Sequence, residues 1–144
     1  MRLDSCCPNL STMSRDLALC DVRPTQLYLS SGKLTDVLAW FDFDDPAYGP
    51  LPVFEHESEW YLADGHTRAF AAYLAGEDHL PVERDPDVRE KYDFEVYRAC
   101  ISWCREEGVE TIADLQGRVV EPETFEAAWV ERCQQVTDNE ELAD

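Results

Sequence analysis

Five consecutive residues between a predicted strand and a predicted helix carry groups that could do chemistry. They are Asp64, Gly65, His66, Thr67 and Arg68, in the stretch YLADGHTRAFAAYLAG. The first amides of a helix have no partner within it, and the helix dipole places partial positive charge there. Glycine lets a ligand approach the backbone, and a hydroxyl and a guanidinium can bind phosphate oxygens. The turn therefore predicts a cradle for a phosphate or a carboxylate.

Two residues of this turn are candidate catalytic groups. His66 can donate a hydrogen bond or exchange a proton near neutral pH. Asp64 repels a phosphate, and three roles for it stay open: a cap of the helix, a ligand of Mg²⁺, or a general base. The competing interpretation is structural, with Asp64 capping, Gly65 easing the bend, and the remaining side chains solvated.

Hydrophobic periodicity and turn residues predict the elements that position this turn. Strands are expected at 17–22, 51–56, 60–63 and 79–85. Helices are expected in SSGKLTDVLAWF, at 66–75, at 93–107, briefly after Thr111, and again from Pro122 onward. In the helix at 66–75, we expect Phe70, Tyr73 and Leu74 to face the core. The fold class is therefore predicted to be α/β (α+β).

Four regions follow from this pattern. A flexible leader is expected over 1–16, a mixed strand and helix domain over 17–85, a helical extension packed on it over 86–137, and an acidic tail over 138–144. We expect the indole rings of Trp103 and Trp129 to attach the extension to the domain or to shape a substrate lid.

The charge of the chain limits the classes of partner. There are 31 acidic and 12 Lys or Arg residues, which gives a net charge of −19. Acids spread along the whole chain favour adaptation to high salt, where the repulsion between them is screened. Non-specific nucleic-acid binding needs a basic surface, so this composition opposes it. No apolar run approaches the roughly 20 residues that span a bilayer, and we expect a cytoplasmic protein without membrane contact.

Cysteine and histidine spacing does not indicate a metal site. The six cysteines contain no CxxC pair, so we expect small buried side chains rather than zinc ligands. A shared site of His56, His66 and His79 is the alternative, but strand and helix positions this far apart need not converge.

The order of strand, RPTQ turn, helix, β-hairpin and DGHTRAFAAYLAG resembles the ParB/sulfiredoxin-like superfamily over residues 17–84. Gly65-His66-Thr67-Arg68-Ala69 is the most specific part and resembles the family's phosphate-binding turn, in a form closest to kinases of free serine. The resemblance implies a small mixed sheet with helices and a nucleotide ligand, ATP, ADP or CTP, with Mg²⁺. It also implies contacts from the first turn, through Arg23, Thr25 and Gln26.

Departures from the family pattern separate the functional hypotheses. Thr67 stands nearest to the catalytic cysteine of sulfiredoxins, and Gln26 stands nearest to the glutamate base of the serine kinases. Our first hypothesis is a nucleotide-dependent phosphotransferase or nucleoside-triphosphate hydrolase that acts on a small-molecule acceptor. The alternatives are a non-catalytic nucleotide-sensing or partner-binding module and a DNA-linked protein of ParB type. Residues 86–144 hold 16 acids and 6 bases, which opposes the last of these.

Overall fold

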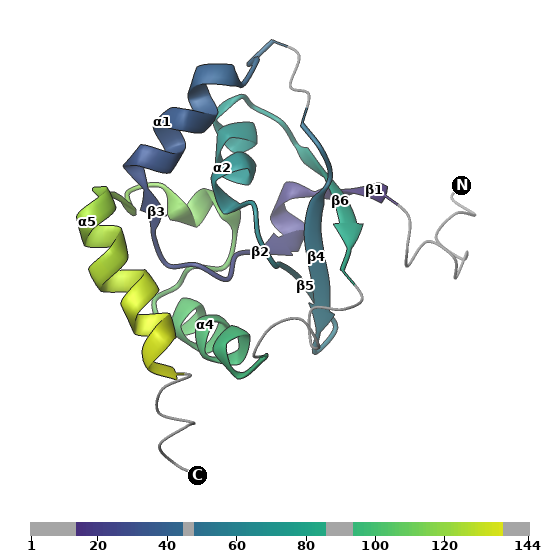
Figure 1. The fold of residues 1–144 in the computed structure, drawn as a ribbon. Coiled ribbons are helices and arrows are strands. Elements are labelled where there is room, and N and C mark those ends of the chain that lie inside the picture. Colours follow the sequence, from purple (N-terminus) through teal and green to yellow (C-terminus); the bar gives the residue numbers. More distant parts are fainter. Residues whose placement is uncertain (1–13, 45–47, 86–93, 137–144) are drawn as a thin grey trace.

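The computed structural model describes residues 14–44, 48–85 and 94–136 (Figure 1). Its larger sheet has five strands, which lie side by side in the order β1 (Ser14–Ala18), β6 (His79–Arg84), β4 (Leu51–His56), β5 (Glu59–Leu62) and β2 (Val22–Arg23). Antiparallel and parallel pairs alternate across this sheet. Two short parallel strands, β3 (Leu29–Ser30) and β7 (Val119–Val120), form a second sheet. The predicted α+β class is confirmed.

Helices surround the sheet and connect its strands. They are α1 (Ser31–Trp40), α2 (His66–Leu74), α4 (Phe94–Glu106), the 3-10 helices η3 (Leu19–Asp21) and η4 (Ile112–Leu115), α5 (Pro122–Phe125) and the π-helical segment η5 (Glu126–Val130). Residues 131–136 continue the last helix. Within the described ranges, no helix combines the length and the apolar character needed to cross a membrane.

Side-chain alternation along β4 and β5 gives the sheet two apolar faces. Val53 and Leu62 belong to the main core, together with the buried Phe70 of α2. Neighbouring residues in the same strands point the other way, because successive side chains of a strand alternate between its faces. Phe54 and Tyr61 form a second cluster with Ile101 of α4. α2 and α4 therefore cover opposite faces of the hairpin, and α2 lies between β4 and α1 (Figure 1).

The predicted strand at 17–22 is interrupted, because its two ends pair at opposite edges of the sheet. β1 pairs with β6, and β2 pairs with β5. The 3-10 helix η3 crosses between these edges, and the amide of Leu19 donates to the Asp78 carbonyl at 2.8 Å. The hydrophobic pattern of residues 17–22 does not indicate which other strand each half of the segment pairs with.

The core face of α2 differs from the expectation at one position. Phe70 is buried and Tyr73 is partly buried, but Leu74 is 46% exposed. The small residues Ala69, Ala71 and Ala72 are fully buried instead. Alanine lets neighbouring elements approach the helix backbone closely, so the packed face of α2 is wider than large side chains alone would indicate.

The C-terminal elements belong to the main hydrophobic core, to which Cys104, Leu115 and Trp129 contribute together with Val53 and Leu62. Strand β7 pairs with β3, directly before α1, and α5 contacts both β3 and α1. The Trp103 and Trp129 rings meet edge to face at 5.7 Å. Two-residue strands have no periodicity to detect, so the sequence did not predict this second sheet.

Candidate functional site

Gly65 shapes the turn between β5 and α2. Its φ of +84° lies in the left-handed region, where only glycine is free of steric cost. A Cβ at this position would lie 2.9 Å from Leu51 Cδ2 and 3.0 Å from Arg68 Nη2. The turn thus needs glycine for its backbone angle and for space. The second of these distances also shows that the Arg68 guanidinium lies close to the turn.

The Asp64 carboxylate leaves the first amides of α2 available. Its Oδ1 atom accepts a hydrogen bond from the Gly65 amide at 2.8 Å. Gly65 is the N-cap of α2, and the first intrahelical bond runs from Ala69 N to Gly65 O at 2.9 Å. The amides of residues 66–68 therefore have no acceptor within the helix. Capping of the helix was one of the three roles open for Asp64. The carboxylate caps one amide, that of Gly65, which precedes the first residue of α2.

A cavity of about 290 Å³ opens at this turn. Asp64–Arg68 all line it, and the other lining residues come from the loop before α1, from α1 and from α5: Gln26, Ser30, Lys33, Asp36, Val37 and Phe125. Ser30 is the N-cap of α1 and accepts a hydrogen bond from the Lys33 amide at 3.4 Å. Two helices therefore begin at one cavity, and the positive ends of both dipoles add there.

His66 lies at the back of the cavity as a neutral imidazole. Its side chain is 2% exposed, and its Nε2 atom accepts a hydrogen bond from the Thr25 amide at 2.8 Å. Burial lowers the pKa of His66 to about 4, although the negative charge of Asp64 acts in the opposite direction. Because Nε2 is the acceptor, the proton of the neutral ring belongs on Nδ1.

The Nδ1 atom of His66 is a buried donor without an acceptor among the described residues. Buried polar groups are almost always hydrogen-bonded. Because His66 is one of the residues that line the cavity, a ligand there is a candidate acceptor for this atom. With a pKa near 4, the ring does not exchange protons near neutral pH. Of the two roles expected for His66, hydrogen-bond donation is therefore the one that fits this geometry.

Thr25 fixes the tautomer of His66 from behind the cavity. Its hydroxyl donates to the Leu62 carbonyl at 2.8 Å, so it is not free to donate to the ring, which lies 3.3 Å away. The Thr25 side chain is itself buried. Thr25 therefore acts as a positioning residue. Its amide orients the His66 ring, and its hydroxyl bonds Thr25 itself to the Leu62 carbonyl.

Two cations that line the cavity have no carboxylate partner within the described part of the chain. These are Lys33 and Arg68. In contrast, Arg23, Arg105 and Arg118 each pair with a glutamate, at 3.3, 3.7 and 3.3 Å respectively. Acids outnumber bases 31 to 12 in this chain, and these two cations nevertheless remain without an ion pair beside the cavity. Together with the helix ends and the His66 donor, they make the cavity suited to an anion.

The first-turn residues divide between the cavity and its surroundings. Gln26 lines the cavity, and its Nε2 atom donates to the Tyr28 carbonyl at 3.0 Å. Arg23 is directed elsewhere, because it forms ion pairs with Glu59 and Glu110 at 3.3 and 3.8 Å. The structure thus brings together Gln26 and the five residues of the turn, with Thr25 behind them and Arg23 outside.

Histidines and acids do not form a metal site of protein ligands alone. Across the described residues, no group of three or more His, Cys, Asp or Glu side chains is arranged to hold a metal ion. His56 lies against the Tyr61 and Phe94 rings, at centroid distances of 6.3 and 5.6 Å, and His79 is exposed. The shared three-histidine site considered from the sequence is therefore not formed.

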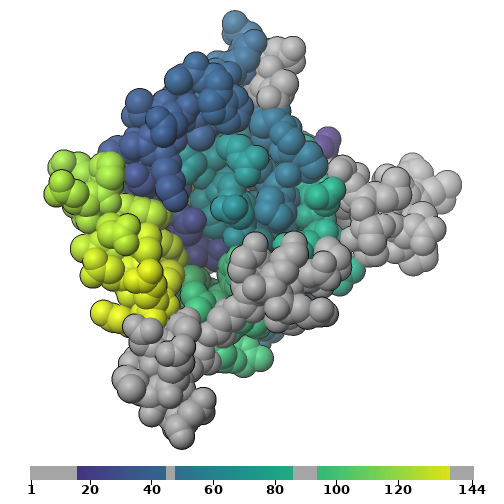
Figure 2. All heavy atoms as spheres, in the orientation of Figure 1, coloured from purple at the N-terminus to yellow at the C-terminus, as the bar shows by residue number. Residues whose placement is uncertain are grey.

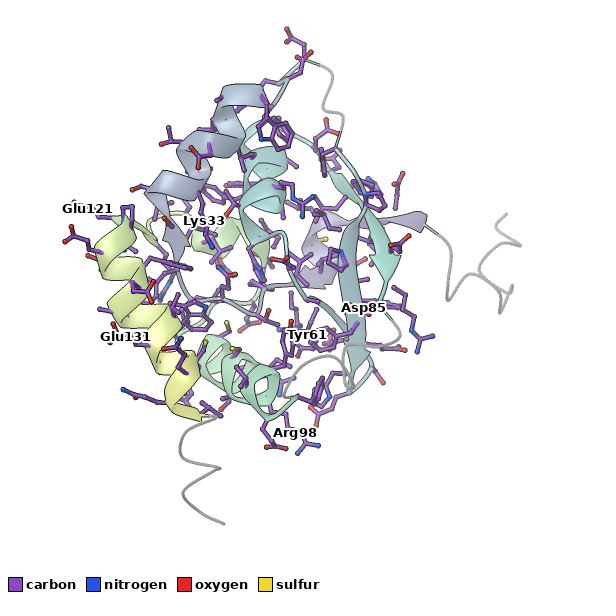
Figure 3. All side chains as sticks on the ribbon, in the orientation of Figure 1. Lys33, Tyr61, Asp85, Arg98, Glu121 and Glu131 are labelled. Carbon is purple, nitrogen blue, oxygen red and sulfur yellow. The ribbon has the colours of Figure 1, made fainter. Side chains whose placement is uncertain are left out.

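Five lining residues were not expected from the sequence: Ser30, Lys33, Asp36, Val37 and Phe125. Ser30 and Lys33 belong to the first turn of α1 and could have been found as a second helix N-terminus, since serine is a common N-cap. Asp36 follows one helical turn after Lys33. Phe125 had no detectable signal, because α5 reaches the cavity only through the tertiary fold. Lys33 extends from α1 toward α5, and its Nζ lies 5.3 Å from the centre of the Phe125 ring (Figure 3).

Comparisons with known proteins give a structural likeness, but no match to a family. No family model matches the chain, and no curated protein matches it. Among solved structures, the chain is similar to protein Atu1540 from Agrobacterium tumefaciens, with 15% sequence identity and a TM-score of 0.48. The alignment covers 84% of this chain and 69% of that one.

Proposed function

We propose that this protein binds a phosphate-bearing small molecule, a nucleotide, with the phosphates in the cavity between the N-termini of α1 and α2. The observation that carries the proposal is that His66 lines that cavity and that its buried Nδ1 donor has no partner among the described residues. The free amides of α2 and the guanidinium of Arg68 supply further donors. The resemblance of the Gly65–Ala69 turn to the ParB/sulfiredoxin-like superfamily points to the same ligand class.

Mg²⁺ would fit this cavity in the way it usually binds beside phosphates. It takes one or two protein carboxylates, with phosphate oxygens and water as its other ligands. Asp36 and Asp64 are two carboxylates of the cavity lining. They would hold the ion at the rim, where it offsets their repulsion of the phosphates. Lys33 and Arg68 would then contact phosphate oxygens that the ion leaves free.

Calorimetry and thermal unfolding test the proposal directly. The probes are ATP, ADP, CTP and inorganic tripolyphosphate, each with and without Mg²⁺, in concentrated salt. A probe at 100 times its dissociation constant should add about 2.7 kcal/mol to the free energy of unfolding. The Arg68→Ala variant should lose most of this gain. Arg84→Ala, which removes an exposed arginine outside the cavity, should retain it. Absence of binding by every probe would contradict the proposal, as would full binding by Arg68→Ala.

Phosphoryl transfer is the second candidate function, because two carboxylates share the cavity with the proposed phosphate site. Gln26 cannot accept a proton as the glutamate of the serine kinases does, so Asp64 or Asp36 would act as the general base. This candidate predicts Mg²⁺-dependent consumption of ATP, ADP or CTP with a small hydroxyl acceptor. Either Asp64→Asn or Asp36→Asn should abolish turnover and leave nucleotide binding measurable, and the variant that does so identifies the base. Binding without turnover for every acceptor would leave a non-catalytic nucleotide sensor as the function.

A further inference from the structure

A second cavity, of about 380 Å³, lies beside the first, between α4 and the C-terminal helix. Figure 2 shows the face of the molecule where this helix (yellow) lies beside α4 (green). The cavity is lined by Gln26, Lys33, Val96, Phe125, Trp129, Val130, Cys133 and Gln134. Three of these residues, Gln26, Lys33 and Phe125, also line the cavity at the α2 turn. The two cavities are therefore neighbours that share one wall.

The shared wall changes from polar to apolar across the Lys33–Phe125 contact. On one side lie the helix ends, His66 and Arg68. On the other side, Val96, Val130 and the aromatic rings of Phe125 and Trp129 make up half of the lining residues. The Lys33 ammonium group lies over the Phe125 ring at 5.3 Å, so its charge is at the boundary between the two regions. A ligand with an anionic end and an apolar, flat end would match this change of character.

Two carboxamides give the apolar cavity its specific polar groups. Gln26 and Gln134 both line it, and each carboxamide can donate and accept hydrogen bonds. The Gln26 amide nitrogen already donates to the Tyr28 carbonyl, so its Oε1 atom is available as an acceptor. Small-molecule sites are typically apolar with a few placed polar groups, and have volumes of roughly 300–1,000 Å³. This cavity has that composition and size.

We propose that the apolar cavity holds the nucleoside end of the nucleotide, with the base between α4 and the C-terminal helix. This inference rests on the proposed phosphate site, and it extends that site to residues of the helical C-terminal part. The base would lie against Phe125 and Trp129, and its polar edge would face Gln26 and Gln134. The C-terminal helix then becomes part of the binding site and determines which organic group is accepted.

The test compares ligands that share phosphates and differ in the organic group. Isothermal titration calorimetry with full-length protein would measure dissociation constants for ATP, CTP and tripolyphosphate, in the same concentrated salt. Wild-type protein should bind ATP or CTP at least about tenfold more tightly than tripolyphosphate, because only the nucleotides reach the second cavity. Val130→Phe, which fills the cavity, should remove this preference and leave tripolyphosphate binding unchanged.

Two further variants keep the test decisive. Ala127 is exposed on the same helix and lines neither cavity, so Ala127→Phe is the matched control and should retain the preference. Gln134→Ala changes an exposed side chain, so it should fold as the wild type does. It should weaken nucleotide binding several-fold without affecting tripolyphosphate.

The outcomes separate the two proposals. If ATP and CTP bind no more tightly than tripolyphosphate, the nucleoside site is overturned and the phosphate site stands. If Val130→Phe and Gln134→Ala both bind nucleotide as the wild type does, the base lies elsewhere and the nucleoside site is again overturned. If no probe binds at all, the proposed function itself fails.

Discussion

The buried histidine makes a quantitative prediction about stability and pH. Burial lowers the pKa of His66 from 6.5 to about 4. As the pH falls through about 6.5, the unfolded chain takes up a proton on this ring, whereas the folded chain does so only near pH 4. The unfolded state binds more protons in this window, so stability is lost as the pH falls. Between about pH 7.5 and about pH 5, the expected loss from this one group is about 2 kcal/mol.

The opposing effect of the acids must be separated from this loss. Protonation of carboxylates relieves repulsion in a chain of net charge −19, and it occurs mainly below pH 5 because their ordinary pKa values are near 4. The measurement is urea unfolding, followed by tryptophan fluorescence at constant ionic strength, at about pH 7.5 and about pH 5. The wild type is compared with His66→Gln, which retains a possible acceptor for the Thr25 amide but does not titrate. Subtracting the two pH dependences isolates the histidine.

The wild type should lose about 2 kcal/mol more stability than His66→Gln over this interval. His79→Gln, at an exposed position, is the control and should follow the wild type. A titration of the histidine ring protons by NMR gives the folded pKa of His66 independently of unfolding. Equal pH dependences of wild type and His66→Gln, with a ring that titrates near 6.5, would refute the neutral, buried imidazole on which the proposed phosphate site depends.

Three other properties follow from the geometry. Gly65→Ala should lower the free energy of unfolding by about 2–3 kcal/mol, because left-handed backbone costs about 1–2 kcal/mol and the new methyl group would press on the buried Leu51. Gly49→Ala should have almost no effect, since a Cβ there meets nothing within 4 Å; equal urea midpoints for the two variants would contradict this reasoning. Iodoacetamide should label Cys20, which is exposed, well before Cys104, because burial raises the pKa of Cys104 to about 12; peptide mass mapping at short times would reveal the reverse order. Finally, the urea midpoint should rise between about 0.1 M and about 1 M KCl, as the Debye length falls from roughly 10 to 3 Å and screens the repulsion; a flat dependence would count against adaptation to high salt.

Local signals in the sequence were sufficient for the elements that carry the turn. The hairpin was expected at 51–56 and 60–63 and is found at Leu51–His56 and Glu59–Leu62. The helix after the turn begins at His66, as expected. Glycine is left-handed at Gly76, just beyond α2. These features depend on residues that lie next to one another in the chain, which is why one sequence was sufficient.

The walls of the candidate site depend on contacts between distant segments, and here the sequence was insufficient. The tautomer of His66 is set by Thr25, which is 41 residues away. Phe125 reaches the cavity because α5 contacts α1 and β3. Arg23, the last residue of β2 and three positions before Gln26, is held outside the site by ion pairs with Glu59 and Glu110. Residue type suggested a role for each of these side chains, but only the tertiary fold decided between them.

The distribution of charge suggests how an acidic protein could still bind an anion. Carboxylates are in excess, and four of the described arginines, Arg23, Arg98, Arg105 and Arg118, form ion pairs with glutamates. A cation that is already paired has little to offer a phosphate, so a usable site needs cations without an ion pair. Among the described residues, Lys33 and Arg68 form none, although Asp36 and Asp64 line the same cavity. In concentrated salt, the field of the whole protein is screened within a few ångström. Recognition of the phosphate would then depend on direct donors, the α2 amides, His66 Nδ1 and the Arg68 fork, more than on long-range attraction. Tripolyphosphate affinity should therefore fall less steeply with salt than it does for proteins that bind anions through an extended basic surface.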